Sequence, residues 1–263
     1  MPFLKTPGFL EPGGDEKLWR YMDLPKYLNL LTTNKIRFTR SDLLGDYFEG
    51  STTAPTKQQM VDFLSSMFPK GSDSEHQISN LLNQEVNVNT FTRTHIYINS
   101  WHLNDGESEA MWKIYSKEFG IAIVSTTNRI LESMQTEENI LKSLVKYIDY
   151  QADEIPPGNY LSPFTYKRLS FKHEEEFRLL LYHKPEDLGP FLSEMPSYDY
   201  LSNAMPSGIH VPVNLDKLIS VVHVSPFAPD WYFESVRDLS AMLNFTFEVK
   251  KSSLDPGVSS PVY

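Results

Sequence analysis

The sequence predicts an α+β fold, and three observations carry this prediction. Segments typical of strands and helices follow one another without the regular β-α-β repeat of a doubly wound sheet. No glycine-rich turn follows the first strand, as a dinucleotide-binding α/β fold would require. The 263 residues are 40% apolar and 22% charged, which is typical of a folded domain. We expect one domain over residues 17–250, with mixed, mostly antiparallel sheets flanked by helices. An irregular arm (1–16) precedes it and a flexible tail (251–263) follows it.

Local signals predict the elements of the first half in turn. Leu18–Met22 is predicted as a strand, and Asp23 can cap a helix that has Pro25 in its first turn and ends near Thr33. The expectations that follow are a strand (Lys35–Thr39), a polar loop (Ser41–Thr53), two helices (Pro55–Phe68 and Ser74–Glu85) and a β-branched strand (Thr92–Trp101).

The second half is predicted in the same way. In order, we expect a helix (Ser108–Phe119), a buried strand (Gly120–Val124), two helices (Asn128–Met134 and Glu138–Lys142), strands (Leu144–Tyr150, Phe177–Tyr182, Ile209–Val213 and Leu218–Val224), a helix (Trp231–Leu243) and a last strand (Phe245–Val249). The stretch Lys184–Ser207 contains four prolines and no clear periodicity, which favours a functional loop or a lid.

Composition excludes several chemistries. With no cysteine there is no disulfide, thiolate metal site, iron–sulfur cluster or cysteine nucleophile. The net charge of −10 argues against sequence-independent binding to nucleic acid, although a local basic groove stays open. No two of the seven histidines have a spacing suited to a shared metal, so no metal site is expected. Met1–Glu16 lacks an apolar core and no segment is long enough to span a bilayer, so we expect a soluble, cytoplasmic protein without a membrane partner.

A dense row of charges lies near residue 176. If Phe171–Leu179 begins a strand, Phe177 and Leu179 face the core, while Glu174, Glu176 and Arg178 share the opposite face. Arg178 would then hold one carboxylate ionised. The row fits either a catalytic pair of carboxylates or a solvated, salt-bridged strand face.

Three further clusters are candidates for a site. Arg20 shares a strand face with Leu18 and Met22, so it needs either a protein carboxylate or an anionic ligand such as a phosphate. The loop that contains Asp46, Tyr47 and Glu49 is either a turn whose aspartates bond their own backbone or a ligand-contacting loop. A third cluster comprises Met111, Trp112 and Tyr115, which lie at helical spacing and indicate a core-facing stripe.

Taken in order, these clusters resemble a bacterial family known as domain of unknown function 2971. The matching motifs are Trp19-Arg20-Tyr21, Gly45-Asp46-Tyr47-Phe48-Glu49, Met111-Trp112-Lys113-Ile114-Tyr115 before Gly120, and Phe171-Lys172-His173-Glu174-Glu175-Glu176-Phe177-Arg178. Gly45 and Tyr47 replace the Asn and Pro of the family's loop, and Phe171 replaces a tryptophan. The resemblance extends from about residue 17 to 245.

The layout of that family is in turn similar to DarT-like ADP-ribosyltransferases. This second resemblance implies a fold like theirs, NAD as co-substrate, and a role as a toxin or an anti-phage effector. Glu176 would stabilise the positive charge that develops on the ribose, and Glu174 would orient the acceptor. Arg20 would pair with the pyrophosphate, and Tyr21 or Tyr47 would stack on a ring. Asp46, Glu49 and Arg178 would complete the binding site for a nucleotide-type molecule.

Two other functions remain open. A non-catalytic binding or sensing module predicts that Glu174, Glu176, Arg178 and Arg20 form one closed salt-bridge network with no adjoining pocket. A metal-dependent nuclease would gather Asp46, Glu49, Glu174 and Glu176 around a cation, although the acidic charge disfavours it. The observation that separates these hypotheses best is whether Arg20 and Glu176 face the same pocket.

Overall fold

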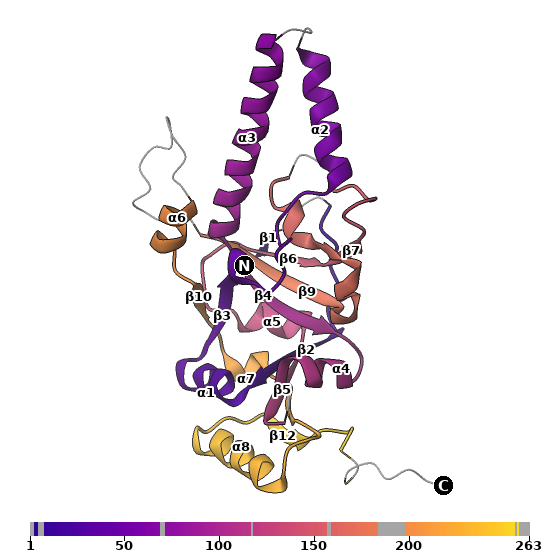
Figure 1. The fold of residues 1–263 in the computed structure, drawn as a ribbon. Coiled ribbons are helices and arrows are strands. Elements are labelled where there is room, and N and C mark those ends of the chain that lie inside the picture. Colours follow the sequence, from indigo (N-terminus) through magenta and orange to yellow (C-terminus); the bar gives the residue numbers. More distant parts are fainter. Residues whose placement is uncertain are drawn as a thin grey trace, which may run out of the picture.

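The fold is α+β, as predicted (Figure 1). The structure is a computed structural model and describes residues 3–4, 8–68, 72–116, 118–156, 159–183, 198–255 and 257. Its helices are α1 (Leu24–Thr33), α2 (Ala54–Met67), α3 (Ser72–His95), α4 (Glu109–Met111), α5 (Thr127–Ser133), α6 (Tyr198–Ala204), α7 (Leu215–Leu218) and α8 (Asp230–Met242). Its strands are β1 (Phe3–Leu4), β2 (Lys17–Asp23), β3 (Lys35–Arg40), β4 (Ile96–Leu103), β5 (Gly120–Thr126), β6 (Ile140–Leu144), β7 (Lys146–Ile148), β8 (Tyr166–Arg168), β9 (Glu176–Tyr182), β10 (Gly208–Pro212), β11 (Val221–Val224) and β12 (Glu248–Lys251).

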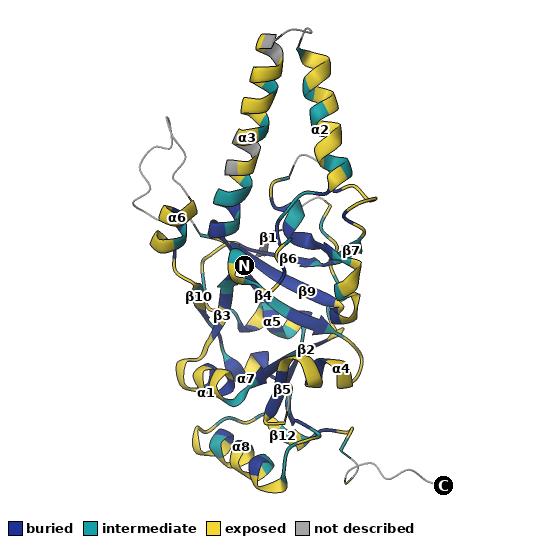
Figure 2. Ribbon diagram, in the orientation of Figure 1, coloured by how far each residue is buried: buried dark blue, intermediate teal, exposed yellow. Residues whose placement is uncertain are grey.

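Ten of the strands in the described residues form one mixed, mostly antiparallel sheet. Its order is β1-β6-β9-β4-β2-β5-β11-β12, with β3 paired to β4 and β10 paired to β3. The pairs β1–β6 and β11–β12 are parallel, and β7 and β8 form a separate parallel pair. Helices flank this sheet, and the strands themselves are largely buried (Figure 2).

The sheet divides along one edge of β4. The first half of β4 pairs with β3, through Ile98 opposite Thr39. The last residues of β4 pair instead with β2, through His102 opposite Trp19. Because β2 and β3 both pair with the same side of β4, they diverge between these two contacts. This fork positions the site described below.

Local signals explain the elements that flank the fork. Asp23 caps α1, since its side chain accepts a hydrogen bond from the Lys26 amide at 2.9 Å. Asn34 ends the helix in a left-handed conformation with φ of 52°, and β3 begins at the next residue. The predictions for β2, α1 and β3 are therefore confirmed.

The main core lies on one face of the sheet. Phe177, Leu179 and Leu181 of β9 are fully buried in it, as their alternation predicts. A second cluster includes Met111 and Trp112, which confirms that this part of the helical stripe faces the core. Tyr115, the third member of the predicted stripe, is half exposed and faces the site instead.

Helices α2 and α3 project away from the body as a hairpin (Figure 1). No residue of α2 is buried, and the outer part of the hairpin is mostly exposed (Figure 2). The predicted strand Thr92–Trp101 is found as β4, but its predicted start is wrong, because residues 92–95 complete α3 and β4 begins at Ile96. The Thr92 hydroxyl donates to the Val88 carbonyl at 2.7 Å, which is how a β-branched residue is accommodated at the end of a helix.

Several other predictions need correction. The predicted helix Glu138–Lys142 is wrong, because Ile140–Leu144 is strand β6, held between β1 and β9. The predicted helix from Ser108 is only the short α4 followed by a π-helical turn, Trp112–Ser116. Within the arm, Phe3–Leu4 pairs with β6. Most of the predicted loop Lys184–Ser207 and most of the tail lie outside the described residues, although residues 198–204 form α6.

Candidate functional site

A pocket of about 1020 Å³ opens at the fork between β2 and β3. Seven of the eight predicted site residues line it: Arg20, Tyr21, Asp46, Glu49, Glu174, Glu176 and Arg178. Tyr47 is not among the lining residues, and its side chain is 84% exposed. Arg20 and Glu176 therefore face the same pocket.

Arg178 is the centre of a buried carboxylate cluster. Its Nη1 and Nη2 donate to Glu49 at 2.6 and 2.8 Å, and its Nε and Nη2 donate to Glu176 at 2.9 and 3.0 Å. Nη1 also donates to the Phe164 carbonyl at 2.7 Å. Both carboxylates are thus held by the planar fork of one fully buried guanidinium.

Lys167 joins the third carboxylate to this cluster. Its ammonium forms ion pairs with Glu174 and, at 3.3 Å, with Glu176. The Tyr115 hydroxyl donates to the other oxygen of Glu174 at 2.6 Å. Glu174 was predicted on the strand, but it ends a 3₁₀ turn, Leu169–Glu174, and Glu175 then adopts a left-handed conformation with φ of 36°. Glu174 reaches the pocket from this turn, beside Glu176 at the start of β9.

Three carboxylates here face two cations, and the pKa values of Glu176 and Glu49 shift in opposite directions. Although burial raises the pKa of Glu176, Arg178 and Lys167 outweigh it and hold the pKa at about 2. Burial lowers the pKa of Arg178, but Glu176 and Glu49 raise it well above the ordinary value, so the guanidinium stays charged. Burial raises the pKa of Glu49 despite its contact with Arg178. Glu176 is therefore a permanent negative charge rather than a group that exchanges protons near neutral pH.

The loop with Asp46 and Glu49 combines the two alternatives that its sequence left open. Asp46 Oδ1 accepts from the Phe48 amide at 3.0 Å, as in a self-bonded turn, and from Arg168 at 2.6 Å. Gly50 has φ of 70° and packs directly under the ring of Phe164. The turn thus shapes the loop, while the two carboxylates line the pocket.

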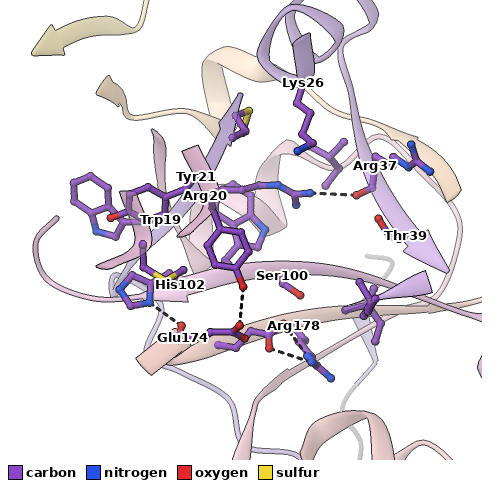
Figure 3. Close-up of a pocket in the computed structure, with 18 of the residues that line it drawn as sticks. Trp19, Arg20, Tyr21, Lys26, Arg37, Thr39, Ser100, His102, Glu174 and Arg178 are labelled. Carbon is purple, nitrogen blue, oxygen red and sulfur yellow. Dashed lines mark hydrogen bonds and ion pairs between the residues drawn. The ribbon is translucent and has the colours of Figure 1, made fainter. Parts of the chain in front are cut away.

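Arg20 lies across the pocket from the carboxylate cluster (Figure 3). Its guanidinium carbon is 5.8 Å from the centre of the Trp101 ring, and its Nη2 makes one long hydrogen bond, 3.4 Å, to the Arg37 carbonyl. Within the described residues no carboxylate pairs with it, and its Nη1 is buried without a partner. Burial lowers the pKa of Arg20 to about 10, so it remains a cation. Of the two partners that the sequence allowed, the protein carboxylate is not found in the described part of the chain.

Aromatic side chains form the wall near Arg20. Tyr21 is buried edge-on against Trp112, with ring centres 4.9 Å apart, and its hydroxyl accepts from the Ser108 amide at 3.0 Å. His102 lines the pocket beside it, with Nδ1 2.7 Å from the Glu174 carbonyl and with Nε2 buried and unpaired. Burial lowers the pKa of His102, which favours the neutral ring.

Four residues that contact Glu174 or Glu176 were not predicted as site residues: Lys167, Ser100 and His102 were not singled out, and Tyr115 was assigned to a core-facing stripe. Ser100 hydrogen-bonds to Glu176, and the other three contact Glu174. Alternation along β4 could have placed Ser100 and His102 on one face. No local signal distinguishes Lys167, and the helical spacing of Tyr115 pointed to the core, because the roles of both residues depend on contacts between separate elements.

No model of a known protein family matches this sequence, and no curated protein matches it either. The resemblance to domain of unknown function 2971 therefore stays a prediction. In the described residues, no three Asp, Glu or His side chains are arranged to hold a metal ion. The same residues contain no helix both long and apolar enough to cross a membrane.

Proposed function

We propose that this chain is an NAD-using enzyme of the ADP-ribosyltransferase type. One observation carries the proposal: Arg20, a cation without a carboxylate partner in the described residues, faces the same pocket as Glu174 and Glu176. The positive and negative ends of the pocket thus suit two parts of NAD, its pyrophosphate and its nicotinamide ribose. The phosphates would bind at Arg20, and the ribose hydroxyls at the carboxylates.

The carboxylate cluster suits this chemistry. When the bond from ribose C1′ to nicotinamide breaks, its electron pair leaves with nicotinamide and positive charge develops on the ribose. Glu176 would stabilise that charge by electrostatics, since its low pKa prevents it from accepting a proton near neutral pH. Glu174 would contact the sugar or the acceptor, with Tyr115 and Lys167 fixing its orientation.

A binding module without turnover is the second candidate, and one observation favours it. Glu174, Glu176 and Arg178 belong to one ion-pair network, in which Lys167 links the two glutamates and Arg178 links Glu176 to Glu49, as that hypothesis predicts. Arg20 lies outside this network, and a pocket adjoins it, which that hypothesis does not predict. Each of the four carboxylates that the nuclease hypothesis requires already contacts an arginine or lysine.

The test measures nicotinamide release and binding together. Purified protein is incubated with NAD, and NAD, ADP-ribose and pyrophosphate are titrated by calorimetry. We expect release by the natural chain, and loss of release with retained NAD binding in Glu176→Gln. The control is Glu175→Gln, an exposed neighbour outside the cluster. Binding without release would support the module, and absence of both binding and release would overturn both proposals.

A further inference from the structure

A second group of basic side chains lines the pocket on strands β3 and β10. Lys35 and Arg37 occupy alternate positions on β3, and the antiparallel register places His210 opposite Arg37. All three line the pocket, as does Lys26 of α1. Figure 3 shows Lys26 and Arg37 on the same side of the pocket as Arg20, away from Glu174.

This end of the pocket is positive in a protein whose net charge is −10. Asp23, a carboxylate among the lining residues, is paired with Lys26 at 3.0 Å. Neither Lys35 nor Arg37 forms an ion pair within the described part of the chain. Burial and then Arg37 and Lys35 lower the pKa of His210, which favours its neutral ring, so Lys35 and Arg37 carry the positive charge here. An anion that binds beside Lys35 and Arg37 neutralises their charge, and the neutral His210 ring can still donate a hydrogen bond to it.

Arg37 is also held in place. Its Nη2 donates to Ser207, at 3.2 Å to the hydroxyl and 3.4 Å to the carbonyl. Its side chain lies across Gly208, where an added Cβ would come within 2.5 Å of Nε. The absence of a side chain at Gly208 therefore gives Arg37 its position. Arg20 donates a hydrogen bond to the backbone carbonyl of Arg37, so the guanidinium groups of Arg20 and Arg37 lie in adjoining parts of the pocket.

We propose that Arg37, Lys35 and His210 form a second phosphate subsite beside Arg20, so that the pocket selects a dinucleotide with a phosphate monoester in addition to its pyrophosphate. The identity of the ligand class rests on the proposed function. Arg20 serves the pyrophosphate, and the additional monoester neutralises the charges of Lys35 and Arg37 on β3, with His210 of β10 as a hydrogen-bond donor. Arginine suits this role because its planar fork binds two phosphate oxygens at once.

The experiment compares NADP with NAD as probes, by calorimetric titration at low and fixed ionic strength. We expect the natural chain to bind NADP about tenfold more tightly than NAD, as one additional charge-assisted contact allows. Arg37→Ala should abolish that preference while NAD affinity changes less than about threefold. Gly208→Ala should reduce the preference without changing any charge, because it displaces Arg37. The matched control is Arg237→Ala, which removes an exposed arginine on α8 and should leave both affinities unchanged.

The outcomes separate this inference from the proposed function. Equal binding of both probes by the natural chain would overturn the subsite, and so would an equal loss for both in Arg37→Ala or an effect of the same size in Arg237→Ala. Nicotinamide release without a preference for the phosphorylated probe would sustain the function and overturn the subsite. A preference for NADP without nicotinamide release would sustain the subsite and overturn the proposed enzymatic activity.

Discussion

Arg178 and Glu49 lie 129 positions apart in the sequence and meet in a buried bidentate ion pair. The pair joins strand β9 to the loop that follows β3. Between Leu44 and Thr53 this loop has no regular secondary structure of its own, so its place beside the pocket depends on contacts of this kind. Arg178 also bonds to Glu176, so one guanidinium fixes two of the pocket's carboxylates.

Removing Glu49 should destabilise the fold strongly. Glu49→Ala leaves the buried Arg178 with fewer acceptors, and breaking a buried pair on one side costs about 3–5 kcal/mol. Urea denaturation measures the free energy of unfolding. Glu248→Ala is the control, because it breaks an exposed pair with Lys250 and should cost less than about 1 kcal/mol. Equal losses in the two variants would contradict the assigned role of Glu49.

Glu176 should make stability depend on pH in acid. Its folded pKa of about 2 lies below the ordinary 4.5, so its contribution is present above pH 4.5 and is lost as pH falls toward 2. The stability difference between the natural chain and Glu176→Gln should shrink by about 2 kcal/mol between pH 5 and pH 3. Urea titrations at these two pH values measure it. A difference that stays constant, or that Glu175→Gln reproduces, would disprove the shifted pKa.

Gly50 should tolerate no side chain. Gly50→Ala would force a Cβ to within 2.3 Å of the Phe164 ring at a residue with φ of 70°. Strain and overpacking together should cost at least about 2 kcal/mol. Gly45 lies in the same loop with open space around it, so Gly45→Ala should change stability by less than about 0.5 kcal/mol. Thermal and urea unfolding of both variants check this, and a stable Gly50→Ala protein would refute the loop geometry.

Arg20 should contribute to binding rather than to stability. Arg20→Met removes a cation that has no carboxylate partner in the described residues, so the melting temperature should stay the same or rise. Pyrophosphate affinity should fall at least about tenfold. Arg129→Met is the contrast, since Arg129 donates to the Asp216 and Ile219 carbonyls at 2.8 and 2.7 Å and its loss should destabilise the fold. A large destabilisation by Arg20→Met would show that Arg20 is structural.

Elements with strong local signals were predictable from sequence. Strand β2, helix α1 and strand β3 follow from short apolar runs and from a capping aspartate within a few residues of one another. Predictions failed where sheet pairing or helix continuation overrode local preference. Residues 138–142 carry a helical pattern, yet Ile140–Leu144 becomes a strand because β1 and β9 offer it hydrogen bonds on both sides.

The site, like the fold, was predictable in part from the sequence. The types and spacing of Glu174, Glu176 and Arg178 indicated a charged row, and the apolar neighbours of Arg20 indicated a cation in need of a partner. Only the tertiary structure decided that Lys167 of β8 joins the glutamates. The fork of β2 and β3 on β4 decided that Arg20 faces them across a pocket without its own carboxylate in the described residues. Ion pairs and pockets form between elements distant in sequence, and strand pairing across the sheet sets which elements meet.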